Sequence, residues 1–182
     1  MRKIGRGSQS GSDSKRDSSS LTDRVVDTCR RVFAHKPRDN QLEAILAILN
    51  GKDSVVLLPT GGGKSLIFQA AAVVAWQLHG SVLLVISPLL ALIQEQTSFL
   101  QSRKVGVPDC SHGKFSSAFW APVKEGKIAL VYTTPEVFAS SSEFRLAVAA
   151  LNTSDSRRLT AFAVDEAHCL LNWCVIIQCW SC

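Results

Sequence analysis

The sequence contains no uninterrupted apolar run of the ~18–20 residues that a bilayer-spanning helix needs. Its charged first residues are not followed by the apolar segment of a secretory signal. These absences argue against a helical membrane protein and against a secreted one. Internal repeats are also lacking, which argues against repeat architectures. We therefore expect a soluble intracellular protein with no membrane partner.

Paired C-x₂-C knuckles are absent as well, although the chain has six cysteines. Four of them fall within the last fourteen residues, with four, four and two residues between them. Structural zinc sites usually combine two closely spaced cysteine pairs, and disulfide frameworks belong to secreted domains. We expect reduced thiols and no zinc site. The cysteines are Cys29, Cys110, Cys169, Cys174, Cys179 and Cys182.

Enough apolar residues are present for a real core, since they make up 46% of the 182 residues, and this length suits one domain. The net charge of +5 is concentrated in residues 1–20, which hold five Lys and Arg against two Asp. This Ser/Gly-rich stretch cannot bury enough surface to offset its ordering entropy, so we predict a disordered tail. We expect this tail to be solvated and flexible, and the alternative is that its basic residues contact nucleic acid.

Helical and strand patterns alternate along the rest of the chain. Helical spacing predicts a helix that starts from an N-cap at Thr22, a second over residues 40–49, and a third over residues 66–76. Ser87 and Pro88 would begin a helix that runs to about Arg103, with proline in its first turn. The remaining helices are predicted over 115–124 and 135–151, and the strands over 55–58, 82–86, 105–107, 128–132 and 159–164. Strands that are apolar on both faces predict a parallel sheet covered by helices on two sides, an α/β fold.

Residues 55–65 combine a short apolar strand, the glycines Gly61, Gly62 and Gly63, and then Lys64 and Ser65 before an apolar helix. Glycines let backbone N–H groups turn inward around a polyphosphate, and the helix N-terminus adds unpaired N–H groups. Lys64 would reach the β/γ-phosphates, and the Ser65 hydroxyl would bind Mg²⁺. Leu58 stands where the strict phosphate-loop pattern has its first glycine. A glycine-rich turn with a chance lysine is the alternative.

The strand over 159–164 ends at Asp165, which is followed by Glu166 and His168. Parallel sheets bind ligands at the carboxyl ends of their strands. Asp165 would hold Mg²⁺ through water, and Glu166 would orient and deprotonate the attacking water. Taken alone, these residues are equally an exposed acidic turn with a surface imidazole. Together with the phosphate loop they predict a site for ATP and Mg²⁺.

Four segments resemble motifs I, Ia, Ib and II of superfamily 2 helicases. They are Leu-Pro-Thr-Gly-Gly-Gly-Lys-Ser (58–65), Ser-Pro-Leu-Leu-Ala-Leu-Ile-Gln-Glu-Gln (87–96), Thr-Pro-Glu (134–136) and Asp-Glu-Ala-His-Cys-Leu-Leu-Asn-Trp (165–173). Their combination resembles the RecQ family of ATP-dependent 3′→5′ DNA helicases. The resemblance implies a RecA-like P-loop NTPase fold over 21–173. It also implies a nucleotide site that includes Thr60, a DNA partner in the form of a single strand or fork, and roles in DNA repair and recombination.

The resemblance further implies that the Gln41 amide reads the adenine edge and that Arg38 packs against the adenine ring. Pro37 replaces the aromatic residue that usually precedes this arginine, which leaves Phe33 or His35 as substitutes for stacking. An exposed first-turn residue is the alternative for Gln41.

Further residues are assigned by the resemblance to DNA contacts. Two segments, Ser87-Pro88-Leu89 and Thr134-Pro135-Glu136, fall at helix starts, where backbone N–H groups would hold DNA phosphates. For Ser87 and Pro88 an ordinary helix cap is the alternative. His168 would link the nucleotide site to the DNA-binding loop, which begins at Trp173.

After Trp173 the match stops, and residues 174–182 form a tail unlike the family. We expect a fold that is incomplete at its C-terminus, without the second RecA-like domain and its arginine finger. Too few residues separate the 159–164 strand from 175–180 for a parallel crossover, so we predict a gap in the sheet beside Asp165. The hypothesis is a truncated helicase product, and the alternative is a non-catalytic ATP- or DNA-binding module that interferes with a full-length partner. A small-molecule kinase is disfavoured because motifs Ia and Ib would have no purpose. The location would be nuclear in a eukaryote and cytoplasmic otherwise.

Overall fold

The computed structural model describes residues 13–59, 61–108, 115–152 and 158–166. In chain order its helices and strands are α1 (Asp13–Phe33), α2 (Asp39–Leu49), α3 (Lys64–His79), β1 (Val82–Ile86), α4 (Leu90–Ser102), α5 (Ser117–Lys124), β2 (Leu130–Thr133), α6 (Pro135–Ser140), α7 (Ser142–Ala150) and β3 (Leu159–Val164). The predicted alternation of helices and strands is confirmed. No helix in the described part of the chain is long and apolar enough to cross a membrane.

The three strands form one parallel sheet in the order β2-β1-β3. The middle strand, β1, is buried along its whole length, which explains its unbroken Val-Leu-Leu-Val-Ile sequence. Because the strands are parallel, their carboxyl ends lie at one edge. Asp165 is held there next to the end of β1, since its backbone N–H donates to the Ile86 carbonyl at 2.9 Å.

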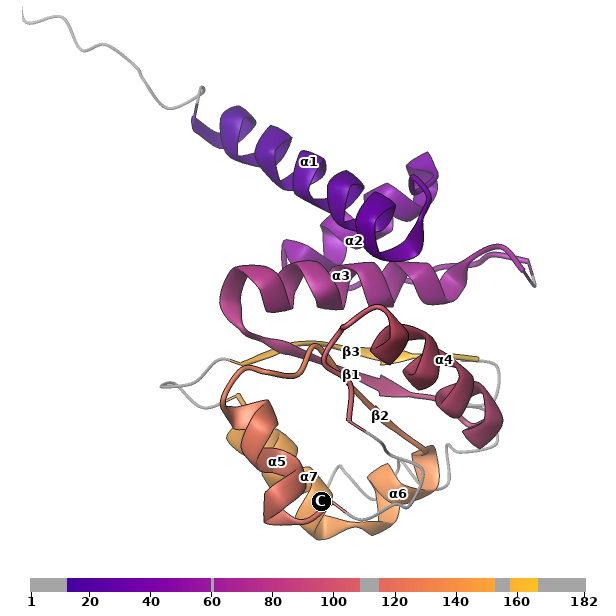
Figure 1. Cartoon of the computed structure of the whole chain (residues 1–182), viewed down its shortest axis with the longest axis vertical. Coiled ribbons are helices and arrows are strands. Elements are labelled where there is room, and N and C mark those ends of the chain that lie inside the picture. The colour runs from indigo at the N-terminus through magenta and orange to yellow at the C-terminus, as the bar shows by residue number, and fades with distance from the viewer. Residues whose placement is uncertain (1–12, 60, 109–114, 153–157, 167–182) are drawn as a thin grey trace, which may run out of the picture.

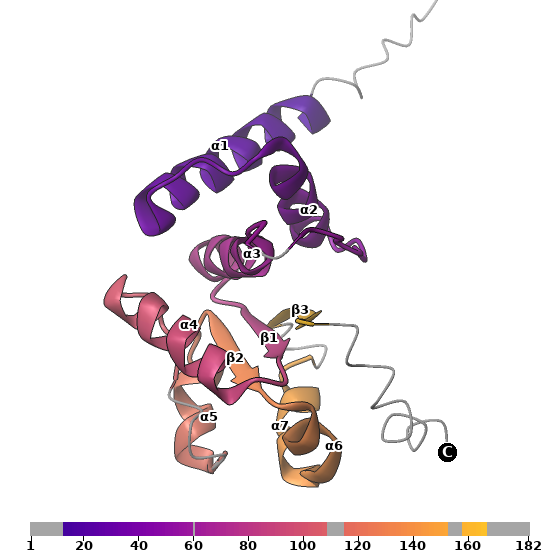
Figure 2. The same cartoon turned by 90° about the vertical axis from the view of Figure 1, so that its right-hand side faces the viewer.

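Helices cover both faces of this sheet, as predicted (Figure 1). Leu83 and Val85 of β1 point to one face, where they pack against α3 and against Ile93 and Leu100 of α4. Val82 and Leu84 point to the other face, where an aromatic cluster around Trp120 and Phe144 packs beneath α5 and α7. Figure 2 shows α1 and α2 stacked outside α3, so that this side of the sheet carries two helical layers. The fold is a mixed α/β fold of the RecA-like type.

The predicted strand over residues 55–58 is wrong. Residues 52–59 have no regular secondary structure, and the side chains of Val55 and Leu57 are 91% and 90% exposed. Val56 and Leu58 do pack against the core, so the segment shows the alternation of a strand without a strand partner. A strand needs a hydrogen-bonded neighbour, and in the described residues the sheet ends at β3. Between β3 and residues 51–58 lies a cleft of about 690 Å³, where the sequence predicts a gap in the sheet.

Other expected boundaries also differ from the structure. The first helix begins at Asp13 rather than after Thr22, so residues 13–20 belong to α1. No Gly or Pro falls between Asp13 and Phe33, and a helix anchored by its buried C-terminal half extends upstream at little cost. The helix after β1 begins at Leu90, so Pro88 precedes it instead of lying in its first turn. Val105 and Val107 are buried, but residues 105–107 form no strand.

Candidate active site

The loop between residues 59 and 64 requires its glycines for two different reasons. Gly61 and Gly63 have φ angles of +74° and +80°, which L-residues with a Cβ rarely adopt. A Cβ at Gly62 would lie 2.8 Å from the carbonyl oxygen of Pro59, which accepts a hydrogen bond from the Gly62 N–H at 2.9 Å. Gly63 is the N-cap of α3, so Lys64 and Ser65 are the first helical residues. This places their side chains where the unpaired N–H groups of the helix begin. Thr60, also predicted to bind the nucleotide, lies outside the described residues.

Gln41 of α2 holds this loop from outside. Its side chain is only 4% exposed, and its Nε2 donates to the carbonyl oxygens of Gly62 at 3.1 Å and Gly63 at 3.3 Å. Its Oε1 accepts from the Arg38 backbone N–H at 2.9 Å, which fixes the orientation of the amide. The alternative of an exposed first-turn residue is therefore wrong, because Gln41 joins α2 to the glycine loop.

The residues around the predicted adenine position differ in their access to a ligand. Arg38 and His35 are exposed, and the His35 Nδ1 lies 2.7 Å from the Phe33 carbonyl oxygen. Phe33 is 6% exposed and its ring stacks on Phe99 with centroids 6.1 Å apart. Phe33 is thus part of the core, and of the two substitutes for the missing aromatic only His35 faces solvent.

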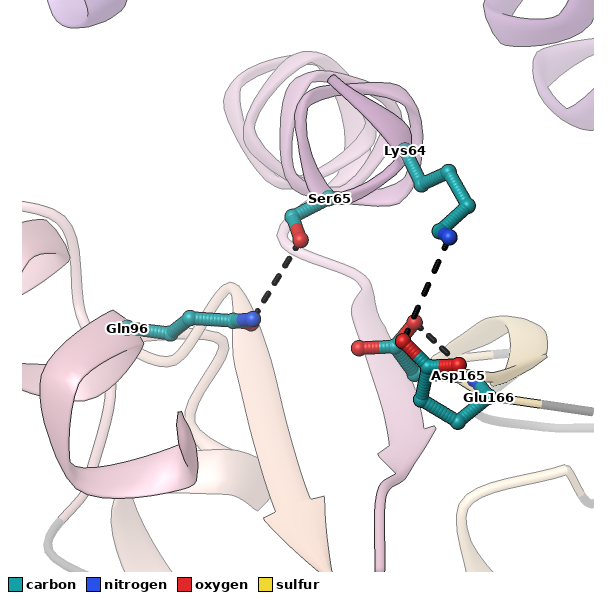
Figure 3. A network of polar contacts seen from close by, with 5 residues as sticks. All are labelled: Lys64, Ser65, Gln96, Asp165 and Glu166. Carbon is teal, nitrogen blue, oxygen red and sulfur yellow. Dashed lines mark hydrogen bonds and ion pairs between the residues drawn. The ribbon is translucent and has the colours of Figure 1, made fainter. Parts of the chain in front are cut away.

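Acidic and basic groups meet opposite the start of α3. The Lys64 Nζ lies 4.0 Å from the Glu166 Oε1, and both side chains are about one-third exposed (Figure 3). Glu166 adopts φ = +53°, a left-handed conformation that is uncommon for residues other than glycine. Its backbone N–H donates to the Asp165 Oδ1 at 3.0 Å. Strained backbone of this kind tends to gather at functional sites, and here it accompanies the turn that carries both carboxylates.

Asp165 is 7% exposed, and burial raises the pKa of its carboxyl above the ordinary value. The hydrogen bond from the Glu166 N–H opposes this rise, the Glu166 carboxylate adds to it, and the Lys64 ammonium opposes it. A buried carboxylate whose negative charge is only partly compensated is stabilised when a cation binds next to it.

The oxygen donors present here suit Mg²⁺. Ser65 supplies a hydroxyl and Asp165 a carboxylate, both hard ligands of the kind that Mg²⁺ prefers. Nowhere in the described ranges do three or more His, Cys, Asp or Glu gather into a metal-binding group. Mg²⁺ is typically held by one or two protein groups together with substrate phosphates and water. The donor set therefore fits a cation that arrives with a polyphosphate.

The cleft beside β3 leads to these groups. It is lined on one side by residues 51–58 and on the other by residues 160–166, and Lys64 lies in its wall with Asp165 and Glu166. The cleft thus carries Lys64, Asp165 and Glu166 in one wall, and Lys52 and Asp53 among the residues of the other.

Sequence reasoning missed a chain of buried polar side chains behind Ser65. The Gln96 Nε2 of α4 donates to the Ser65 Oγ at 3.3 Å (Figure 3). The Gln69 Nε2 of α3 donates to the Gln96 Oε1 at 3.3 Å and to the Tyr132 Oη of β2 at 3.2 Å. Gln69, Gln96 and Tyr132 are 5%, 8% and 0% exposed. The available signal was a single glutamine inside the otherwise apolar start of α3.

The residues predicted to contact DNA are only partly accessible. Ser87 is 1% exposed, and its Oγ has no hydrogen-bond partner among the described residues. Leu89, in contrast, is 55% exposed, and its backbone lies just before α4. The Thr134 Oγ1 accepts from the Val137 N–H at 3.4 Å and so caps α6, with Pro135 buried and Glu136 exposed. His168 and Trp173 lie outside the described residues.

Comparison with known proteins agrees with this geometry. Residues 38–180 match the model of the DEAD/DEAH box helicase family. The chain is 40% identical over 145 residues to ATP-dependent helicase SGS1 of Saccharomyces cerevisiae, and the aligned region covers 75% of this chain and 10% of the relative. It is 38% identical over 144 residues to RecQ-like DNA helicase BLM of Xenopus laevis, covering 76% of this chain and 10% of that protein. ATP-dependent DNA helicase Q5 of Rattus norvegicus is 38% identical over 160 residues, with 82% and 16% covered.

The chain thus spans between about a tenth and a sixth of the length of these relatives. The matched region contains the glycine loop, the buried glutamine that holds it and the paired carboxylates of the Asp165 turn. These residues and their geometry confirm the resemblance seen in the sequence: the chain belongs to the DEAD/DEAH box helicase family and resembles its RecQ-type members.

Proposed function

We propose that residues 21–173 bind ATP together with Mg²⁺ and hydrolyse it as the first RecA-like domain of a RecQ-type DNA helicase. In such a helicase, hydrolysis drives 3′→5′ translocation along DNA. The observation that carries the proposal is the convergence of Lys64, Asp165 and Glu166 in one cleft wall beside a glycine loop. These groups come from two elements separated by a hundred residues of chain.

Each residue has a distinct part in this proposal. The N–H groups of Gly61 and Gly63 bind phosphate oxygens, and Lys64 neutralises the β/γ-phosphates. Gly62 shapes the turn between them, since its N–H already donates to the Pro59 carbonyl oxygen. Ser65 and Asp165 hold Mg²⁺, which neutralises charge on the phosphate oxygens when it is bound.

Glu166 and the adenine-side residues complete the site. Glu166 is paired with Lys64 at 4.0 Å in the ligand-free chain. When the lysine turns to a phosphate, this carboxylate becomes available to orient and deprotonate the attacking water. Gln41 and Arg38 contact the adenine. Gln41 already holds the loop through its Nε2, so adenine recognition and loop position are joined in one side chain.

The DNA contacts of the proposal are the backbone N–H groups near Leu89 and near Glu136, with His168 and Trp173 linking DNA to the nucleotide site. Contacts of this type are independent of sequence, which suits a protein that moves along one strand. Binding is therefore expected to weaken steeply with salt.

The central test is nucleotide binding by Lys64→Ala. Loss of one charge-assisted interaction with phosphate of ~1.5–3 kcal/mol corresponds to ~10–100-fold weaker binding of a fluorescent ATP analogue with Mg²⁺. Lys52→Ala is the matched control, because Lys52 is exposed and lines the same cleft but lies outside the glycine loop. Equal losses in both variants would mean that the cleft attracts anions only through its general charge, and would refute the proposed site.

A polypeptide of these 182 residues alone is expected to hydrolyse ATP weakly and not to unwind a forked duplex. The arginine finger that the family takes from its second RecA-like domain is worth ~10³–10⁵ in rate in related phosphoryl transfers. Robust unwinding by this polypeptide would contradict the assignment of a single RecA-like domain.

A non-catalytic module that binds ATP or DNA and interferes with a full-length partner is the second candidate. It is favoured by the unpaired, exposed segment 52–58, which leaves the base of the glycine loop without the support of a sheet. Salt-dependent DNA binding without DNA-stimulated hydrolysis would support this candidate over the first.

A further inference from the structure

The hydroxyl of Ser65 is the endpoint of a buried hydrogen-bond chain that crosses three elements. The chain runs from Tyr132 on β2 through Gln69 on α3 to Gln96 on α4, and from there to Ser65 at the first turn of α3. Buried polar groups of this kind cost free energy unless they are paired. An apolar residue at position 69 or 96 would pack in the same space, so the two glutamines call for a role beyond packing.

The direction of each hydrogen bond in this chain follows from the orientation of the two glutamine amides. The Gln69 Nε2 has two protons, and it gives them to the Gln96 Oε1 and to the Tyr132 Oη. With its Oε1 used as an acceptor, the Gln96 amide must present its Nε2 to Ser65. The Ser65 Oγ therefore acts as an acceptor toward α4. One of its two lone pairs is taken and the second remains for a cation.

We propose that Gln96 is a positioning residue for the cation site, with Gln69 and Tyr132 holding its amide in the donating orientation. Gln96 itself touches neither nucleotide nor metal. It acts through the Ser65 hydroxyl, whose rotation it restricts so that a free lone pair is ready for Mg²⁺. The inference rests on the proposed nucleotide site and names the groups that prepare one of its ligands.

The placement of these residues also joins the cation site to two segments predicted to contact DNA. Gln96 lies on α4, whose start follows Leu89, and Tyr132 is followed on the same strand end by Thr133 and Thr134. A shift of α4 would therefore alter the distance between Gln96 and Ser65. Groups that orient a metal ligand commonly affect metal affinity strongly without contacting the metal.

The test is a Mg²⁺ titration of nucleotide binding, read by the fluorescence polarisation of a non-hydrolysable fluorescent ATP analogue. For Gln96→Leu we expect the Mg²⁺ concentration at half-effect to rise by ~10–100-fold. Nucleotide affinity measured in EDTA should stay equal to that of the unmodified chain. Gln69→Leu removes the anchor of the Gln96 amide and should move the Mg²⁺ midpoint in the same direction.

Ile93→Val is the matched control. Ile93 is 3% exposed and lies one turn before Gln96 on the same helix, so its truncation weakens the packing of α4 without touching the polar chain. It should leave the Mg²⁺ midpoint unchanged. A midpoint that moves equally in Ile93→Val and Gln96→Leu, or that moves in neither glutamine variant, overturns the positioning role.

The same titration separates this inference from the function on which it rests. If the unmodified chain binds the analogue equally well with Mg²⁺ and with EDTA, the proposed cation site itself is refuted. If the unmodified chain responds to Mg²⁺ and both glutamine variants respond at the same midpoint, only the role of Gln96 is refuted.

Discussion

Replacement of Gly63 by alanine tests whether Gln41 holds the glycine loop. At Gly63 a Cβ would lie 2.5 Å from the Gln41 Nε2, so the amide would have to move. It would then lose its hydrogen bonds to the Gly62 and Gly63 carbonyl oxygens at 3.1 and 3.3 Å. The chain supplies a matched control at Gly61, which has a similar φ of +74° but, beyond its chain neighbours, no atom of the described residues within 4 Å of the position of its Cβ.

The magnitudes separate the two variants. A left-handed backbone with a Cβ costs ~1–2 kcal/mol, and this cost applies to Gly61→Ala and Gly63→Ala alike. Gly63→Ala adds the loss of two hydrogen bonds at ~0.5–1.5 kcal/mol each. We expect a loss of about 1–2 kcal/mol in the free energy of unfolding for Gly61→Ala and about 2–5 kcal/mol for Gly63→Ala.

Urea unfolding followed by tryptophan fluorescence measures both values, provided that the dependence on urea is unchanged. The excess cost of Gly63→Ala should disappear in a Gln41→Ala background, because the clash and the hydrogen bonds are then already absent. Equal losses for the two alanine variants, or an excess that survives Gln41→Ala, would refute the idea that Gln41 holds the loop.

Three further changes test other parts of the structure. Leu57→Ser should alter the free energy of unfolding by no more than ~0.5 kcal/mol because Leu57 is exposed, whereas Leu83→Ala in β1 should cost ~2–5 kcal/mol. Urea unfolding measures both values, and a loss above ~2 kcal/mol for Leu57→Ser would mean that residues 52–58 are buried. Burial raises the pKa of Asp165, so the folded chain holds this proton more tightly than the unfolded chain and is penalised once the pH exceeds the ordinary carboxyl pKa. Asp165→Asn should therefore raise the melting temperature at neutral pH without nucleotide, with a gain that vanishes on acidification, and a lower melting temperature at neutral pH would contradict this. Burial raises the pKa of Cys29 to about 11, so at pH 8 only ~10⁻³ of this thiol is ionised. Peptide mapping after iodoacetamide treatment should find Cys29 unmodified until the chain is unfolded. Rapid labelling of the native chain would contradict its burial.

Much of the fold was predictable because it depends on local patterns. Apolar runs at Val82–Ile86 and Leu159–Val164 predicted parallel strands, of which β1 is buried throughout, whereas β3 leaves Phe162 50% and Val164 39% exposed. Sequence patterns also predicted α2 and α3, and one helix over 135–151 that the structure divides into α6 and α7. The start of α3 at Lys64 follows from glycines that cannot continue a helix and from the helix-forming residues after them. Asp165 at the end of β3 follows in the same way from the end of an apolar run. Each of these features is decided by residues that are neighbours in the chain.

The segment over residues 52–58 shows where local patterns fail. Val55, Val56, Leu57 and Leu58 are as apolar as any strand of this chain, yet two of the four side chains are exposed. Whether such a run becomes a strand is decided by the presence of a hydrogen-bonding neighbour, and β3 is too far away across the cleft to supply one. The composition of a segment carries no information about that neighbour.

The sequence by itself determined that a glycine turn, a lysine and a hydroxyl would stand at the head of one helix, and that two carboxylates would follow a buried strand. The tertiary structure alone decided that Lys64 pairs with Glu166, that Gln41 is hydrogen-bonded to the glycine loop, and that Gln96, itself part of a buried hydrogen-bond chain, donates to Ser65. The physical reason is that turns and helix starts are set by backbone preferences of adjacent residues. Contacts across 21 to 102 positions depend instead on how the layers pack, which no single stretch of sequence specifies.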